Sequence, residues 1–384
     1  MTESMDRRAP EPRRASGRRP APLIDLGSLV DLAQRGLARM FDAEQGQFCF
    51  TARRTASGLE RQGVSLRYTL ISLLGLHKLE CSQSHPTTVP VKSVCGRLVE
   101  NPRVLDNLGD LGLLLWLCAL VTPDRLEALV ENAGVDRALT RYRDARLRST
   151  TGLAWFLTGL TYALAGRPRE CHRLDALARE TFRLLCRNQG PHGFFGHLAG
   201  GRSLTGLVRG RIGNFADQVY PIYALSRFGQ LLTDREALDR ATRCANAICR
   251  VQGSLGQWWW LYDAPSGRVV HRYPVYAVHQ EGMAPMALFG VGEAIRADFT
   301  APIYSGLEWI ARNELGQDLR DGTSQVVWRD IERRKRPIKY LIELADFLRP
   351  RSSVSAGSLT INHECRPYEL GWLLYAFAGW ESRQ

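Results

Sequence analysis

The stretch "CRNQGPHGFFGH" at residues 186–197 recurs as "CRVQGSLGQWWW" at residues 249–260, so the chain contains an internal repeat. Weaker copies stand at "RNELGQ", residues 312–317, and at "FDAEQGQFCF", residues 41–50. Self-similarity of this kind indicates an array of repeated structural units. The two clear copies share the frame Gln-x-x-x-Gly-x-aromatic, occupied by Gln189, Gly193 and Phe195 and then by Gln252, Gly256 and Trp258.

Two kinds of expected helix alternate around this repeat. One kind is amphipathic, with apolar residues at three- and four-residue spacing, and covers residues 27–41, 86–100, 123–146, 172–188, 234–251 and 300–313. The other kind is apolar or small on nearly all sides and covers residues 64–79, 108–121, 151–165, 215–231, 280–295 and 367–380. A helix that is apolar all round has to be covered all round. Six covered helices alternating with six amphipathic ones predict an all-α fold, an (α/α)6 toroid with an inner and an outer ring.

The toroid accounts for residues 22–384 as a single domain. We find no run of alternating apolar and polar residues long enough for a sheet, but long loops such as residues 258–272 leave room for short β-hairpins. Residues 1–21 are rich in arginine and proline and lack an apolar segment. That composition is typical of a disordered arm.

Composition limits the partners and the compartment. The 384-residue chain has a formal net charge of +12, which favours anionic partners in general. The N-terminus lacks the apolar core of a secretory signal, and the longest apolar run, residues 111–121, is shorter than the roughly 20 residues that span a bilayer. We therefore expect a cytoplasmic protein without a membrane span. No cofactor fingerprint, metal-ligand spacing or nucleic-acid motif occurs, so we expect no cofactor, no metal and no nucleic-acid partner, and no oligomeric state is specified.

The chain resembles two superfamilies that share this toroid. One is the six-hairpin glycosidase-like group, which contains hydrolases, epimerases and polysaccharide lyases that act on sugars. The other is the terpenoid cyclase and protein prenyltransferase group, because the frames at 189–195 and 252–258 look like the QW repeat of squalene-type cyclases. In those cyclases the repeat mainly ties helices together, so the resemblance implies a structural role for it here.

The chemistry of the cyclase group is missing from the sequence. No Asp-x-Asp-Asp or Asp-Asp-x-x-Asp string occurs, and the two-residue spacing of His363 and Cys365 does not match the prenyltransferase zinc ligands. The glycosidase-like resemblance, which implies a carbohydrate-active enzyme, is therefore the better guide.

Polar side chains concentrate where the inner helices are expected to begin, which in such toroids is the mouth of the barrel. An acid in a first helical turn also stabilises the helix dipole, and a histidine in an apolar helix is often only a core residue. The accumulation of acids, His, Tyr and Arg at one end of the helices nevertheless favours a functional pocket. The repeat loop adds His192 and His197. The catalytic candidates are Asp217, Tyr220, Tyr276, His279 and Glu281, and the substrate-binding candidates are Asp110, Trp259, Trp260, Asp263, Arg272, His363, Arg366 and Glu369.

The three consecutive tryptophans have two expected roles. Trp258 occupies the aromatic position of the repeat and should plug the gap between neighbouring hairpins. At least one of Trp259 and Trp260 should face the pocket, because aromatic rings stack on the apolar faces of sugars.

The residue types suit proton transfer on an acidic sugar. Glycoside hydrolysis needs two carboxylates across the scissile bond. Elimination from a uronate, or its epimerisation, needs a base beside the sugar carboxylate and a cation such as Arg272 or Arg366 to neutralise it. The sequence thus predicts a hydrolase, lyase or epimerase that acts on a small-molecule or oligosaccharide substrate, an anionic glycan or glycoconjugate.

Two alternatives stay open. A terpenoid-cyclase-like or prenyltransferase-like protein with divergent chemistry would have a closed, mainly aromatic pocket with a buried acid such as Asp217. A non-catalytic toroid that binds a partner would pair its polar residues with each other and leave no cavity.

Overall fold

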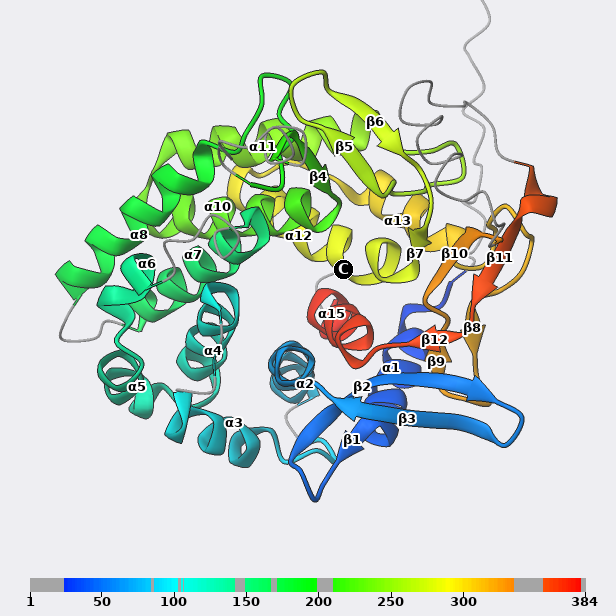
Figure 1. Cartoon of the computed structure of the whole chain (residues 1–384), viewed down its shortest axis with the longest axis horizontal. Coiled ribbons are helices and arrows are strands. Elements are labelled where there is room, and N and C mark those ends of the chain that lie inside the picture. The colour runs from blue at the N-terminus through cyan, green and yellow to red at the C-terminus, as the bar shows by residue number, and fades with distance from the viewer. Residues whose placement is uncertain are drawn as a thin grey trace, which may run out of the picture.

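Helices that begin and end close to the predicted apolar segments form a closed inner ring. The computed structural model describes residues 24–83, 86–102, 105, 107–141, 149–166, 171–198, 210–334 and 355–380. Within them the inner ring consists of α2 (Leu66–Gln83), α4 (Leu108–Val121), α7 (Thr150–Ala165), α10 (Ala216–Leu232), α12 (Ala284–Ile295) with a preceding π-helical turn (His279–Met283), and α15 (Pro367–Phe377). Each inner helix contacts the next one along the chain, and α15 contacts α2 (Figure 1).

Amphipathic helices cover this ring from outside. The outer helices in the described residues are α1 (Leu26–Met40), α3 (Val91–Glu100), α5 (Leu126–Asn132), α6 (Ala138–Arg141), α8 (Cys171–Cys186), α11 (Arg235–Arg250) and α13 (Thr300–Trp309). Helix α1 packs on α15, α3 on α2 and α4, α5 on α4, α8 on α7, and α11 on α10 and α12. Helix α13 packs on α12 and its π-helical turn. The predicted (α/α)6 toroid is confirmed, and the predicted arm, residues 1–21, lies outside the described residues.

One predicted outer helix, residues 123–146, is divided into short pieces. Its described part consists of two single 3-10 turns, at Pro123–Arg125 and Val135–Arg137, and the short helices α5 and α6. Gly134 separates α5 from the second turn, because it adopts a left-handed conformation with φ of 58°. That conformation ends a helix and is readily adopted by glycine.

Small residues let the inner helices approach until their backbones touch. A Cβ atom on Gly159 of α7 would lie 2.2 Å from the carbonyl oxygen of Gly112 in α4. A Cβ atom on Gly75 of α2 would lie 2.1 Å from the carbonyl oxygen of Gly371 in α15. Glycine at these crossings therefore allows the tight ring.

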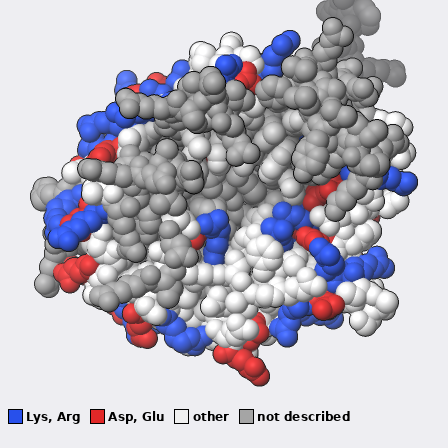
Figure 2. All heavy atoms as spheres, viewed as in Figure 1, with Lys and Arg blue, Asp and Glu red and all other residues white. Residues whose placement is uncertain are grey.

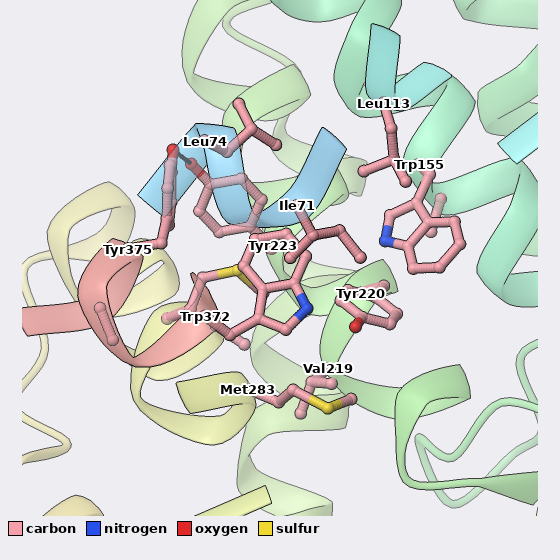
Figure 3. Close-up of a cluster of buried hydrophobic side chains, with 14 of the residues drawn as sticks. Ile71, Leu74, Leu113, Trp155, Val219, Tyr220, Tyr223, Met283, Trp372 and Tyr375 are labelled. Carbon is pink, nitrogen blue, oxygen red and sulfur yellow. Dashed lines mark hydrogen bonds between the residues drawn. The ribbon is translucent and has the colours of Figure 1, made fainter. Parts of the chain in front are cut away.

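Large side chains from the inner helices meet at the axis of the ring. Figure 3 shows Ile71, Trp155, Tyr220 and Trp372, from α2, α7, α10 and α15, pointing toward one another. The rings of Trp155 and Tyr220 are 4.8 Å apart between centroids, and those of Tyr220 and Trp372 are 5.7 Å apart. The axis is thus a packed aromatic core, and the open space lies at the ends of the ring.

In both clear copies of the sequence repeat, the glutamine side chain links its loop to the following outer helix by hydrogen bonds. In the first copy, Gln189 Nε2 donates hydrogen bonds to the carbonyl oxygens of Gly193 (3.1 Å) and Arg240 of α11 (2.9 Å). In the second copy, Gln252 Nε2 donates to those of Gly256 and Pro302 of α13, both at 2.9 Å. The repeated aromatic residues, Phe195 and Trp258, are fully buried. This geometry matches the structural role that the QW-like frame implies.

Short strands lie in the loops between helices. They are β1 (Phe41–Asp42), β2 (Gln47–Thr55), β3 (Gly58–Val64), β4 (Ile212–Asn214), β5 (Leu261–Asp263), β6 (Arg268–His271), β7 (Val275–Tyr276), β8 (Arg320–Asp321), β9 (Val326–Val327), β10 (Asp330–Arg333), β11 (Leu359–Asn362) and β12 (Glu364–Cys365). All pairings within the described residues are antiparallel: β2 pairs with β1, β3 and β12, β10 with β7 and β11, β5 with β4 and β6, and β8 with β9.

The β5–β6 hairpin lies in the loop where a short hairpin was expected, but the longer β2–β3 hairpin was not predicted. Buried residues of β2 come in adjacent pairs, Phe48 with Cys49 and Thr51 with Ala52. Because β2 also contacts α1, α2 and α15, its buried positions do not alternate as they would in a simple two-faced sheet.

Candidate functional site

A cavity of about 350 Å³ opens where all six described inner helices begin. Polar residues at the starts of five of these helices line it: Arg67 and Tyr68 of α2, Asn107 before α4, Ser149 before α7 and Thr151 within it, Asn214 before α10, and Tyr368 of α15. His279 and Met283, from the turn before α12, complete the ring of helix starts. The other lining residues are Ile71, Gly152, Trp155, His197, Ala216, Tyr220, Trp260, Tyr276 and Arg329. Polar residues from separate inner helices thus meet at one end of the ring, and four of the predicted site residues are among the lining: Tyr220, Trp260, Tyr276 and His279.

The helix starts contribute partial positive charge to one end of the ring. Asn107 caps α4 by accepting a hydrogen bond from the Asp110 amide (3.0 Å), and Ser149 caps α7 by accepting one from the Gly152 amide (3.1 Å). Helix N-termini carry unpaired N–H groups and the positive end of the helix dipole. Several such ends around one cavity favour an anionic ligand.

Two arginines line the cavity, and each is held by a carboxylate behind it. Arg67 donates from Nε (2.6 Å) and Nη2 (3.1 Å) to the two carboxylate oxygens of Asp110. Arg329 donates from Nη1 to Glu369 Oε1 (2.5 Å), and its Nε lies 3.5 Å from Asp330. The predicted residues Asp110 and Glu369 therefore position cations and do not line the cavity themselves. On the face drawn in Figure 2, basic side chains gather near the centre as well as at the edge.

His197 and Asp217 form a hydrogen-bonded pair at the same cavity. The distance from His197 Nδ1 to Asp217 Oδ2 is 2.9 Å, and the His197 side chain is 43% exposed. Asp217 is fully buried and also accepts hydrogen bonds from Thr151 Oγ1 and the Asn214 amide, both at 3.0 Å. A carboxylate that holds one imidazole nitrogen fixes the orientation of the ring. Asp217 is thus a positioning residue, and His197 is the group of this pair that lines the cavity.

An aromatic wall lines another part of the cavity. The rings of Trp260 and His279 lie nearly parallel, at 11° and 6.1 Å between centroids, and Tyr276 lies 5.0 Å from each of them. Burial lowers the pKa of His279 to about 3 and raises the pKa of Tyr276 to about 12. Burial also raises the pKa of Tyr220 well above its ordinary value. Each of these shifts favours the uncharged form of the predicted catalytic residue.

Glu281 follows His279 in the π-helical turn before α12. It is fully buried, and neither carboxylate oxygen has a hydrogen-bond partner among the described residues. Burial, and after it the nearby charge of Glu369, raises the pKa of Glu281 well above its ordinary value. Burial therefore favours the uncharged form of Glu281, and its side chain does not line the cavity.

The remaining predicted binding residues lie outside the cavity. The Arg272 guanidinium covers the Trp259 ring at 5.0 Å, and the Trp259 indole nitrogen donates to the Val251 carbonyl (2.8 Å). Asp263 belongs to β5 and lies 3.7 Å from Arg211. His363 is exposed and its ring centroid lies 5.1 Å from that of Trp328. Arg366 donates from Nη1 to the Tyr68 hydroxyl (2.8 Å) and so contacts a lining residue without lining the cavity itself.

Sequence reasoning missed Arg67 and Arg329 and did not select His197. Each arginine stands in a stretch that carries no motif, so only the ring of helices shows that they meet. The one feature of the sequence that points to His197 is its place on the repeat loop. Only the structure shows that His197 is hydrogen-bonded to Asp217.

A larger cavity, of about 700 Å³, lies at the opposite end of the ring. It is lined in part by Lys78, Tyr223, Arg227 and Tyr375, toward the C-terminal ends of the inner helices. Helix C-termini expose carbonyl oxygens and the negative end of the dipole, which do not favour an anion. Within the described residues, no group of three or more His, Cys, Asp or Glu side chains could hold a metal ion. No described helix is long and apolar enough to cross a membrane.

Comparison with known proteins places the fold among solved glycosidase structures. A possible member of the GH105 family from Klebsiella pneumoniae matches with a TM-score of 0.62 and 11% identity over 98% of this chain and 100% of its own. An unsaturated glucuronyl hydrolase specific for heparin matches with a TM-score of 0.59 and 13% identity, over 93% and 97% of the two chains. A glycosidase in complex with glucose matches with a TM-score of 0.55 and 14% identity, over 92% and 97%. No protein-family model and no curated protein sequence matches the chain.

These matches define the class of fold. The chain has the (α/α)6 toroid fold of these structures along nearly its whole length.

Proposed function

We propose that the protein is a carbohydrate-active enzyme that binds an acidic sugar, a uronate, in the cavity at the helix starts. The observation that carries this proposal is the meeting of Arg67, Arg329 and the N-termini of the inner helices at one cavity. The sugar carboxylate would take hydrogen bonds from the arginines, which are already oriented by Asp110 and Glu369. Trp155, which also lines the cavity, and Trp260 offer apolar surface for the sugar ring.

The lining residues favour proton transfer beside the sugar carboxylate. None of the described residues that line the cavity is Asp or Glu, so the two-carboxylate arrangement of glycoside hydrolysis is not the one that the geometry supports best. His197, oriented by Asp217, is placed to take or give a proton. A cation near the carboxylate would stabilise the negative charge that builds up when that proton leaves. Elimination and epimerisation share this step.

The structural neighbours support the substrate class. One of them is described as an unsaturated glucuronyl hydrolase specific for heparin, and another was solved with glucose. The cavity of this chain is lined by two arginines, Arg67 and Arg329, which favours an acidic over a neutral sugar.

The proposal is tested by incubating the protein with acidic and neutral oligosaccharides in heavy water. Ultraviolet absorbance reports the gain or loss of a sugar double bond, and NMR reports deuterium at carbon. We expect turnover of uronates only, and a loss of about 100-fold or more in His197→Gln. His192→Gln, an exposed histidine on the same loop, is the matched control and should keep full activity. Turnover of neutral sugars alone, or an active His197→Gln, would contradict the proposal.

The alternatives make different predictions about the cavity. A cyclase-like pocket would be closed and mainly aromatic, whereas this one is lined by Arg67, His197 and Arg329. A non-catalytic toroid would pair its polar residues, as Arg67 with Asp110 does, but it would leave no cavity. Tight binding of a uronate without turnover would favour a binding module.

A further inference from the structure

A row of aromatic rings leads out of the cavity. Tyr68 and Tyr368 line the cavity, and their ring centroids are 4.6 Å apart. On its other side Tyr68 stacks against Phe50 of β2, at 5.5 Å between centroids and 16° between ring planes. Phe50 does not line the cavity and is 43% exposed. We call Phe50, Tyr68 and Tyr368 the aromatic row.

Phe50 is exposed although it lies between buried residues of β2. Its neighbours Phe48 and Cys49 on one side, and Thr51 and Ala52 on the other, are all buried. Large exposed hydrophobic residues are few in the described residues, and the other two, Leu231 and Leu255, belong to other regions of the chain. An exposed aromatic ring beside a polar cavity offers a sugar an apolar surface to pack against.

Arg366 contacts two members of the aromatic row. The Arg366 guanidinium lies 4.7 Å from the Phe50 ring centroid and donates to the Tyr68 hydroxyl. Contacts of this kind favour the observed ring positions, which lowers the entropy lost when a ligand packs against the rings.

The surroundings of the row are basic. Strands β2 and β3 carry Arg53, Arg54 and Arg61 against a single acid, Glu60. Arg366 adds a further cation, while Glu364 of β12 forms an ion pair with Arg53. The net positive charge matches an acidic chain better than a neutral one.

We propose that the aromatic row is a second sugar subsite, which holds the residues that follow the terminal uronate of an acidic oligosaccharide. This inference rests on the proposed function, because it places the terminal uronate in the cavity. The row is continuous with the cavity wall through Tyr68, so a chain that starts on Arg67 and Arg329 can leave along the β2–β3 hairpin. The ligand is then an oligosaccharide that is bound by its end.

The test is calorimetric titration of the whole protein with uronates of one, two and four residues, in a galacturonate series and a heparin-derived series. We expect the longer chains to bind more tightly than the monosaccharide. Phe50→Ala should weaken binding of the four-residue chain by roughly threefold to tenfold, the effect of one aromatic contact, and leave the monosaccharide unchanged. Leu255→Ala, which removes an equally exposed apolar side chain elsewhere, is the control and should change neither.

The outcomes separate this inference from the proposed function. If the monosaccharide binds but longer chains gain nothing, or if Phe50→Ala weakens all lengths equally, the subsite is refuted and the proposed function stands. If the protein binds no uronate of any length, the proposed function fails and the subsite fails with it.

Discussion

Gly256→Ala should lower the free energy of unfolding by about 2–5 kcal/mol. Gly256 has a φ of 93°, and a Cβ atom there would lie 1.9 Å from the carbonyl oxygen of Ser305 and 2.4 Å from its carbonyl carbon. The left-handed backbone costs a non-glycine residue about 1–2 kcal/mol. Moving the loop away from α13 to make room for the methyl group adds about 1–3 kcal/mol, because both contacting groups are backbone.

Gly316→Ala is the matched control, because it places a methyl group on a similar backbone but without a close contact. Gly316 also has a positive φ, 61°, but a Cβ atom there would meet nothing within 4 Å. It should therefore cost only the backbone term of about 1–2 kcal/mol. Urea unfolding of both variants compares the two losses of stability. A shift of the midpoint reports a change in stability if the m-values of the variants are equal. Equal losses in the two variants would refute the close approach of the repeat loop to α13.

Three further results are expected. Gln252→Ala removes the amide that ties the second repeat loop to α13, so urea unfolding should show a loss of about 1–3 kcal/mol; an unchanged midpoint would mean that the tie is dispensable. Tyr223→Phe removes a hydroxyl that lies 2.8 and 2.7 Å from two other tyrosine hydroxyls, so the loss should be about 1–2 kcal/mol, whereas a more stable variant would show that this cluster is strained. Glu281→Gln should flatten the dependence of stability on pH. Burial raises the pKa of Glu281 in the folded protein, so the folded protein keeps a proton that the unfolded chain releases. The stability of the wild type therefore falls as the pH rises above about 4.5. Urea midpoints measured from pH 5 to pH 8 should fall less in Glu281→Gln than in the wild type, and parallel profiles would show that Glu281 is ionised in the folded state.

The ring of helices could be predicted because the pattern of apolar residues along the sequence shows which sides of each helix are buried. Segments such as 108–121 are apolar on every side, and only an inner ring covers such a helix completely. The repeat loops were recognisable because glycine and glutamine are needed at fixed positions in each copy. The β2–β3 hairpin escaped prediction because its burial depends on α1, α2 and α15, which lie elsewhere in the sequence.

The site could be predicted only as a region. Asp110 and Glu369 stood out as acids at the starts of apolar helices, but their role depends on Arg67 and Arg329, which no local pattern marks. Charged residues are common on surfaces, so a buried ion pair between distant segments is visible only once the fold is known.

The central claim is that an acidic sugar binds at the starts of the inner helices. A crystal structure of the wild-type protein soaked with a uronate disaccharide tests it most directly. We predict sugar density in the cavity, with its carboxylate within hydrogen-bond distance of Arg67 or Arg329. Sugar density only in the larger cavity at the other end of the ring, near Arg227, would contradict the claim.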